Sequence, residues 1–202
     1  MELVLGETGM TAYSLIKVIH IFSAILMAWP FYALLIVNQR IQLGPPLGDR
    51  VDVYMETIIK NRAVPCFVFQ ATVLVSGLLM LLLSGQGLTP LFDNPAVGLK
   101  FVLLLLISAQ LSHVHFRLQP QIDLAFEQWR AAASFETVGQ IERFRLRRKR
   151  LASFCMLFVL TNSMLGVQVW RPFPWWMNAG LMATITLFTW RAYKGVPTYG
   201  WF

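Results

Sequence analysis

Two ionisable side chains, Lys17 and His20, lie inside a long apolar stretch, residues 13–37, where neither is expected without a reason. Their spacing of three residues places both on one face of a helix. Ionisable groups in such stretches usually face a protein interior or a cavity. A neutral imidazole is also a common haem ligand, so His20 is a candidate for binding a haem iron.

The residues that follow His20 on the same helix face are small or flexible: Ser23, Ala24, Met27 and Ala28. They would leave room for a flat macrocycle beside the histidine. The alternative is a hydrogen bond from His20 to a neighbouring helix, with Ala24 and Ala28 as a small-residue packing face, which is a common arrangement in membranes. The residues alone leave both interpretations open.

Lys100 opens another apolar stretch, residues 96–118. The topology argued below places it on the same side of the membrane as Lys17. Two cations at one level could bind an anion such as a haem propionate. The alternative is that both lysines extend their ammonium groups to the membrane surface.

A third polar group combines two histidines and two cysteines near the opposite membrane surface: Cys66, His113, His115 and Cys155. These residue types could form a tetrahedral zinc or copper site. However, residues 113 and 115 lie about 200° apart around an ideal helix. The commoner interpretation is two thiols in helix packing and two histidines at a wet interface.

His113 is not expected to share a haem with His20. The two lie in stretches that run in the same direction, at depths that differ by about ten residues, or roughly 15 Å along a helix. If haem is bound, the sequence therefore favours a haem held by His20 alone, or one haem on each side of the membrane, over one haem shared by both histidines.

The composition determines the kind of scaffold that must position these residues. Of the 202 residues, 56% are hydrophobic and 13% are charged, whereas a soluble domain usually carries about 25% charged residues. The apolar residues fall in runs of about 20, long enough to cross a hydrocarbon core of roughly 30 Å. Since backbone groups must be paired inside lipid, these runs predict helices. We expect one all-α integral membrane domain over residues 1–202, with five spans at residues 13–37, 63–84, 96–118, 151–170 and 175–192.

The basic residues predict the orientation. Fourteen of the 17 Lys and Arg lie in segments 38–62 and 117–150 or after residue 190. The positive-inside rule then places the N-terminus outside and the C-terminus in the cytoplasm, in a bacterial inner membrane. This confinement to particular loops argues against nucleic acid as a partner. The run Arg143–Arg150 is interpreted as a topology anchor, or alternatively as a site for anionic lipid headgroups.

Both basic loops contain helical patterns. In segment 38–62 a short helix should follow Asp49, with Val51, Tyr54, Met55 and Ile58 on one face. In segment 119–150 the apolar spacing predicts one or two amphipathic helices lying at the inner membrane surface.

Two stretches resemble the HemJ/CopD-like group of small bacterial membrane proteins. The stretch LIKVIHIFSAILMAWPFYALLIVNQR is similar to the first helix of that group, and NPAVGLKFVLLLLISAQLSHVHFRL is similar to its third. The residues that carry the resemblance are Lys17, His20, Ser23, Ala24, Trp29 and Lys100. The resemblance implies a b-type haem. In the HemJ branch it also implies oxidation of protoporphyrinogen IX.

Two functional hypotheses follow. The first is a haem-b membrane protein of redox metabolism, with His20 on the iron and Lys17 and Lys100 near the propionates. The second is a non-catalytic accessory subunit of a larger electron-transfer or photosynthetic membrane complex. The second is favoured by an aromatic belt at residues 170–176, an apolar C-terminal segment GVPTYGWF and the absence of a complete catalytic set in the sequence. The sequence therefore does not decide whether the protein is an enzyme.

Overall fold

A computed structural model describes residues 2–28, 33–37, 40, 43–61, 63–132, 134–169 and 171–194, with side chains from residue 12 onward. Over these residues the regular structure is entirely helical. The elements are α1 (Glu2–Leu26), α3 (Arg50–Asn61), α4 (Ala63–Leu83), α5 (Pro90–Asp93), α6 (Pro95–His113), the π-helix η1 (Val114–Leu118), α7 (Gln119–Ala131), α8 (Phe135–Gln168) and α9 (Trp175–Lys194). Residues 33–37 are also helical.

Within the described residues, three helical stretches are long and apolar enough to cross a membrane: 50–83, 95–131 and 135–168. A shorter apolar helix covers Ala12–Leu26. The predicted helices at residues 63–84 and 96–118 are confirmed as helices, because α4 covers the first and α6 with η1 covers the second.

The prediction of one unbroken helix over residues 13–37 is wrong. The helix α1 begins earlier, at Glu2, and ends at Leu26, so that Met27 and Ala28 lie beyond it. The sequence supplies a physical reason. Pro30 has no N–H to donate, and a proline ring clashes with the carbonyl four residues earlier, which here is that of Leu26. Trp29, one of the residues that carried the family resemblance, lies outside the described residues.

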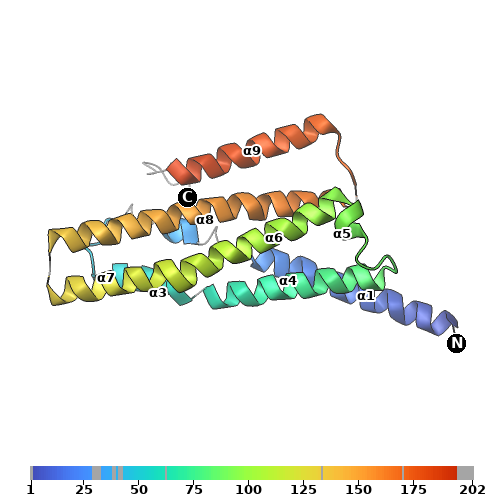
Figure 1. The fold of residues 1–202 in the computed structure, drawn as a ribbon, viewed down its shortest axis with the longest axis horizontal. Coiled ribbons are helices and arrows are strands. Elements are labelled where there is room, and N and C mark those ends of the chain that lie inside the picture. Colours follow the sequence, from blue (N-terminus) through green and yellow to red (C-terminus); the bar gives the residue numbers. More distant parts are fainter. Residues whose placement is uncertain are drawn as a thin grey trace.

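The segment 119–150 is helical as predicted, but its helices do not form a separate layer along the membrane surface. The helix α7 continues the line of α6 through η1, and α8 is one helix of 34 residues that contains the second half of the predicted loop and most of the predicted fourth span. Figure 1 shows α7 and the start of α8 as a hairpin that prolongs the bundle. The apolar residues of this segment pack between the two helices, in a cluster of Leu118, Ile122, Ala125, Phe126 and Ile141.

The short π-helix η1 lies directly before a proline. Pro120 has no N–H, so the carbonyl of Phe116 lacks its usual partner four residues later. The chain instead adopts the wider register, and the N–H of Gln119 donates to the carbonyl of Val114. Such insertions are frequent at functional sites.

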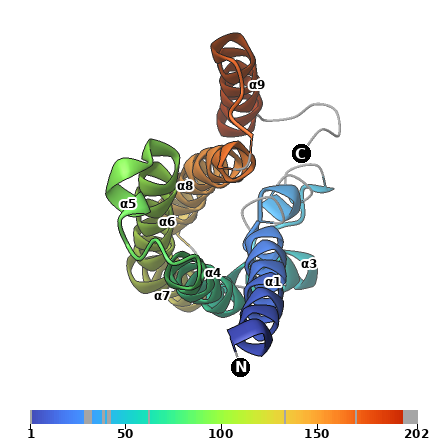
Figure 2. The same cartoon turned by 90° about the vertical axis from the view of Figure 1, so that its right-hand side faces the viewer.

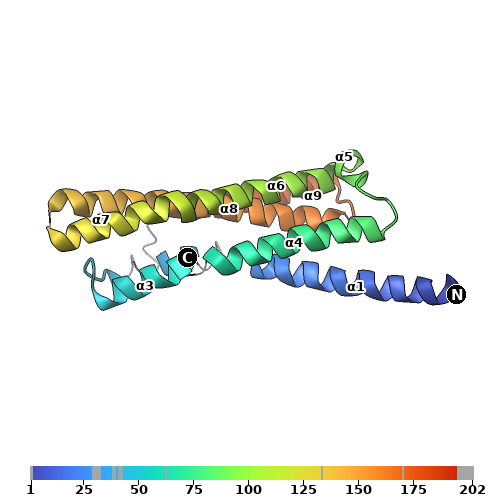
Figure 3. The same ribbon diagram turned by 60° about the horizontal axis from the view of Figure 1, so that its bottom comes forward.

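The long helices pack in sequence around an open curve, seen end-on in Figure 2. The helix α1 packs on α4, α4 on α6, α6 on α8, and α8 on α9. A core cluster joins α4, α6 and α8 with the residue that follows α1; its members are Met27, Cys66, Val73, Leu104, Ile107 and Val159. Figure 3 shows α3 and α7 at one end of the molecule and the N-terminus of α1 at the other.

Candidate functional site

His20 is held by a hydrogen bond to the neighbouring helix α4. Its Nδ1 lies 3.0 Å from the hydroxyl of Ser76. That hydroxyl lies 2.5 Å from the carbonyl of Thr72, within its own helix. Because a serine hydroxyl has one proton and the carbonyl can only accept, Ser76 accepts from the Nδ1–H of His20. The imidazole Nε2 then carries the lone pair, which is the form that can bind a metal.

The ring of His20 lies directly against the backbone of α4. A methyl group at Gly77 would lie 3.2 Å from the Cε1 of His20 and 3.6 Å from its Nδ1. On the α1 side, Ser23 and Met27 are buried and Ala24 packs against the core cluster. The predicted interhelical hydrogen bond and small-residue packing face are therefore confirmed, whether or not His20 also binds a ligand.

Lys100 lies in the second turn of α6, close to α8. Its Nζ would lie 3.4 Å from a methyl group placed on Gly166, and its carbonyl accepts from the Nδ2 of Asn162 at 3.4 Å. The ammonium group acts electrostatically on His20. Among the described residues, no carboxylate lies within ion-pair distance of Lys100. Lys100 is therefore a partly buried cation without a described acid beside it.

Two features around His20 bear on whether it could hold a haem iron. Histidines that bind metals usually donate their other ring N–H to a fixed acceptor, and Ser76 is that acceptor here. Lys100 supplies a cation near the histidine, as a propionate would require. Lys17 lies one helical turn before His20 on α1 and is partly buried.

The zinc or copper site that two histidines and two cysteines could form is not assembled among the described residues. Cys66, His115 and Cys155 line one cavity of about 80 Å³, but His113 is not part of its lining. Over the described ranges, no three His, Cys, Asp or Glu side chains form a group that could hold a metal ion. Both thiols are free, so they belong to helix packing around the cavity.

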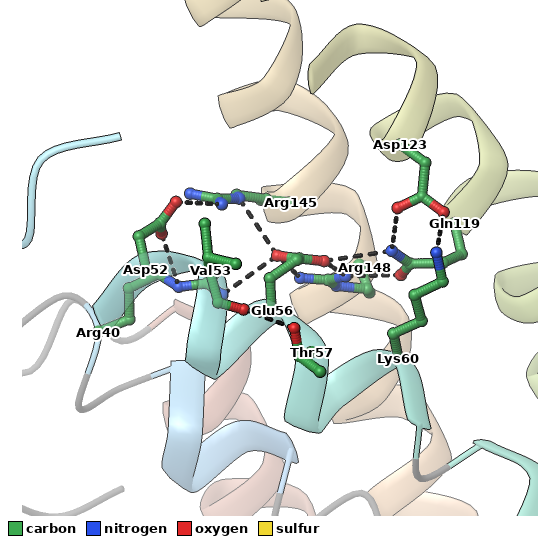
Figure 4. Close-up of polar contacts among 10 residues, drawn as sticks. All are labelled: Arg40, Asp52, Val53, Glu56, Thr57, Lys60, Gln119, Asp123, Arg145 and Arg148. Carbon is green, nitrogen blue, oxygen red and sulfur yellow. Dashed lines mark hydrogen bonds and ion pairs between the residues drawn. The ribbon is translucent and has the colours of Figure 1, made fainter. Parts of the chain in front are cut away.

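The most extensive polar arrangement was not predicted. It is a group of buried charges at the end of the molecule formed by α3, α7 and the start of α8, drawn in Figure 4. We call it the ionic cluster; its members are Arg40, Asp52, Glu56, Gln119, Arg145 and Arg148. Their side chains come from segments that are distant in the sequence.

Glu56 is the centre of the ionic cluster. Both of its oxygens accept from Arg148, one of them at 2.9 Å. Arg40 approaches the same carboxylate at 3.1 Å and Arg145 at 3.5 Å. The amide of Gln119 donates to Glu56 at 3.2 Å, while its oxygen accepts from Arg148 at 2.7 Å. Glu56 therefore ties α3 to both α7 and α8.

Asp52 is the second anion of the ionic cluster, and its side chain is 1% exposed. It pairs with Arg40 at 3.2 Å and with Arg145 at 2.9 Å. It also accepts from the backbone N–H of Gly48 at 3.1 Å, where α3 is about to begin. Three guanidinium groups share two carboxylates, so the cluster carries one excess positive charge.

The charges determine the pKa of Glu56. Burial alone would raise it, but the hydrogen bond from Arg148 and the charges of Arg148, Arg40 and Arg145 lower the pKa of Glu56 to about 2. The pKa of the Arg40 guanidinium is lowered, first by burial and then by the neighbouring Arg145. At neutral pH Glu56 is therefore ionised.

Of the residues predicted to share one face of α3, Met55 is buried but Tyr54 is not. Tyr54 is 66% exposed, whereas Asp52, Met55 and Ile59 are buried. The segment Arg143–Arg150 was interpreted as a topology anchor, but two of its residues also form ion pairs inside the protein. These are Arg145 and Arg148, which are mostly buried. The spacing of the charged residues in the sequence could have indicated the ionic cluster. Asp52 and Glu56 are four residues apart and the two arginines three, so each pair shares a helix face.

Comparison of the chain with protein-family models, with curated proteins and with solved structures found no match. Functional inference for this chain therefore rests on its own residues and geometry, chiefly His20 with Ser76 and Lys100, and the ionic cluster.

Proposed function

We propose that this chain is a haem-b protein of membrane redox metabolism in which His20 is the axial ligand of the iron. The observation that carries the proposal is the hydrogen bond from His20 to Ser76, which leaves the Nε2 lone pair for a metal. The weak likeness of the stretches around His20 and Lys100 to HemJ/CopD-like proteins points in the same direction.

The proposed topology has five spans, with the N-terminus outside and the C-terminus inside a bacterial inner membrane. The apolar helices α1 and α9 would join the three longer helical stretches. The distribution of charge supports this orientation. In Figure 1 the end of α9 and the hairpin of α7 and α8, which are rich in Lys and Arg, lie at the end opposite the N-terminus. His20 and Lys100 then lie in the outer half of the membrane, and the ionic cluster lies at the inner surface.

Each residue near His20 has a defined task in this proposal. Ser76 holds the Nδ1 proton and fixes the orientation of the ring, and Gly77 lets the ring approach α4. Lys100 and Lys17 would neutralise the propionates. The haem, when bound, supplies one-electron transfer. In a HemJ-like protein the substrate would be protoporphyrinogen IX.

The absorption spectrum of the purified full-length protein tests this proposal. We expect a Soret band that is lost in His20→Ala and retained in His113→Ala, a control histidine at the far end of α6. A protein that shows no Soret band, even after incubation with haem, contradicts the proposal. So does a band that His20→Ala leaves unchanged.

A second candidate is an accessory subunit of a larger electron-transfer or photosynthetic complex. The observation that favours it is α9, whose main packing partner is α8 and whose first residues, Trp175 and Trp176, are 80% and 64% exposed. Trp170 and the segment GVPTYGWF, which also favoured this hypothesis, lie outside the described residues. Purification from native membranes in mild detergent distinguishes the candidates, because a subunit should carry stoichiometric larger partners with it.

A further inference from the structure

The cavity of about 80 Å³ already described is lined by Ala63 to Gln70 on α4, by Gln110 to Gln119 along α6, η1 and α7, and by Arg148 to Cys155 on α8. Each of these segments spans seven to nine residues, which is about 10–14 Å along a helix. A volume of this size spread over such a length leaves a width of roughly one small molecule.

Two amide oxygens in the cavity lining are buried without a hydrogen-bond partner in the described part of the chain: Oε1 of Gln70 and Oε1 of Gln110. Gln70 is 4% exposed, and its Nε2 donates to the sulfur of Cys66 at 3.5 Å, which orients the amide. The Nε of Arg148, another lining residue, is also buried and unpartnered. Each such group costs about 1–3 kcal/mol unless a ligand satisfies it.

The ligand must therefore both donate and accept hydrogen bonds, and it must be small. Water meets both conditions, and the volume corresponds to two or three molecules at about 30 Å³ each. A hydrocarbon chain would leave the amide oxygens unpaired. An aromatic ring needs a cavity of about 150 Å³. A metal ion could not accept a hydrogen bond from the Nε–H of Arg148.

The two ends of the cavity differ. The side chain of Lys60 is 51% exposed, which marks the open end beside the ionic cluster. His115 also lines the cavity, and its ring packs against Phe67 with centroids 5.9 Å apart. The other end, at Gln70, meets the core cluster, where Ile107 is completely buried. That apolar core separates the cavity from His20.

We propose that this cavity is a water inlet, which admits a short file of water from the inner membrane surface to Gln70 and Gln110 in the interior. The role that we give to the inlet, a path for protons, rests on the proposed redox function. A redox reaction inside the membrane that releases or takes up protons needs a hydrated path to one surface, and the inlet provides the inner part of that path. Its occupation by water does not depend on a bound haem.

The two cysteines of the chain make the inlet testable, because both line the cavity and the sequence contains no others. The full-length, haem-free protein in lipid nanodiscs is exposed to silver ion, which is small enough for a single file of water. Silver replaces the thiol proton, and the blocked fraction is read by alkylating the remaining thiols after denaturation, followed by mass spectrometry. We expect Cys66 to be blocked in the folded protein.

The matched variant is Gln70→Leu combined with Gln110→Leu, which removes the orphan acceptors and should slow the blocking of Cys66 at least tenfold. The single variant Gln110→Leu serves if the double variant does not fold. A control cysteine, Ile107→Cys with Cys66→Ser and Cys155→Ser, should stay unblocked, because that position lies in the core beyond the inlet. An unreactive Cys66 in the folded wild-type protein overturns the inlet, as does equal reactivity in the wild type and in the leucine variants. None of these results involves the Soret band, so the inlet and the haem proposal can fail separately.

Discussion

The two polar regions of the molecule handle buried charge in opposite ways. In the ionic cluster three arginines meet two carboxylates, and nearly every charge has a partner from another segment. Around His20 lie the two cations Lys17 and Lys100, and no described carboxylate pairs with Lys100. The ion pairs of the ionic cluster hold α3, α7 and α8 together.

The difference indicates which region is available for a ligand. Because the charges of the ionic cluster are paired with one another, the cluster should bind an added ion only weakly. Breaking the cluster leaves buried charges uncompensated. A partly buried cation without an acid beside it is attractive to an anion from outside the chain. We therefore assign structure to the ionic cluster and ligand binding to the region of His20 and Lys100.

The largest effect is expected from Glu56→Gln, which keeps the shape of the side chain and removes the central anion of the ionic cluster. Arg148 and its neighbours would lose their main partner while still buried. Breaking a buried pair in this way typically costs about 3–5 kcal/mol. Thermal unfolding in detergent, followed by tryptophan fluorescence, measures the loss. Glu127→Gln, an exposed carboxylate on α7, is the control and should change stability little. Similar losses in both variants would remove the structural role assigned to the cluster.

A comparable effect is expected on acidification. The pKa of Glu56 is about 2 in the folded protein against an ordinary value of 4.5. A depressed carboxylate pKa stabilises the fold fully above the ordinary value, and this contribution disappears as pH falls from about 4.5 towards 2. The shift corresponds to about 3 kcal/mol. Unfolding free energies measured between pH 6 and pH 2.5 should therefore converge for the wild type and Glu56→Gln. A constant difference over that range would contradict the assigned pKa.

In the region of His20, the informative substitution is Ser76→Ala. It leaves the Nδ1–H of His20 without its acceptor, so the ring is no longer fixed. Loss of such a supporting partner lowers the affinity for a bound metal by about 10- to 100-fold. Titration of the apoprotein with haem, followed at the Soret band, measures the change. Ser108→Ala is the control, because that hydroxyl donates to Leu104 within its own helix. Equal haem affinity in all three proteins would show that Ser76 does not support an iron ligand.

The smallest effect is expected from Gly77→Ala. Its methyl group would lie 3.2 Å from the His20 ring, and this contact must relax by a few tenths of an ångström. We expect the gain in helix propensity to be cancelled by this contact. Gly180→Ala in α9, where nothing lies within 4 Å, should stabilise the protein by about 0.5–1 kcal/mol. Thermal unfolding of both variants measures the difference, which should vanish if the ring of His20 does not rest on Gly77.

Part of this structure was predictable from local patterns. The apolar runs predicted α4 and α6 almost to their ends, since a bilayer-length run has few alternatives to a helix. The break in α1 was also readable, because Pro30 lies four residues beyond Leu26. Hydropathy alone does not show this break, because a proline within an apolar run leaves the run just as apolar.

Other features depend on contacts that no local pattern contains. Arg148 and Glu56 are 92 residues apart in the sequence, and Arg145 and Asp52 are 93 apart. Helical periodicity in 119–150 predicted helices but not their direction, because an amphipathic face fits a partner helix as well as a membrane surface. The positions of Cys66, His115 and Cys155 in their spans placed them near one surface, but sequence positions alone do not show that three helices enclose a cavity there.

The length of α8 has one further consequence. A helix of 34 residues is about 51 Å long, while the hydrocarbon core of a bilayer measures roughly 30 Å. If α8 crosses the membrane, about 20 Å of it therefore extends beyond the hydrocarbon core. This projecting part of α8 is supported by contacts with α7 and α3. In the proposed orientation, a soluble protein that approaches the cytoplasmic face would touch this projecting part of α8 before it reached the lipid. The ionic cluster, where this projecting part of α8 joins the rest of the bundle, would keep its direction fixed.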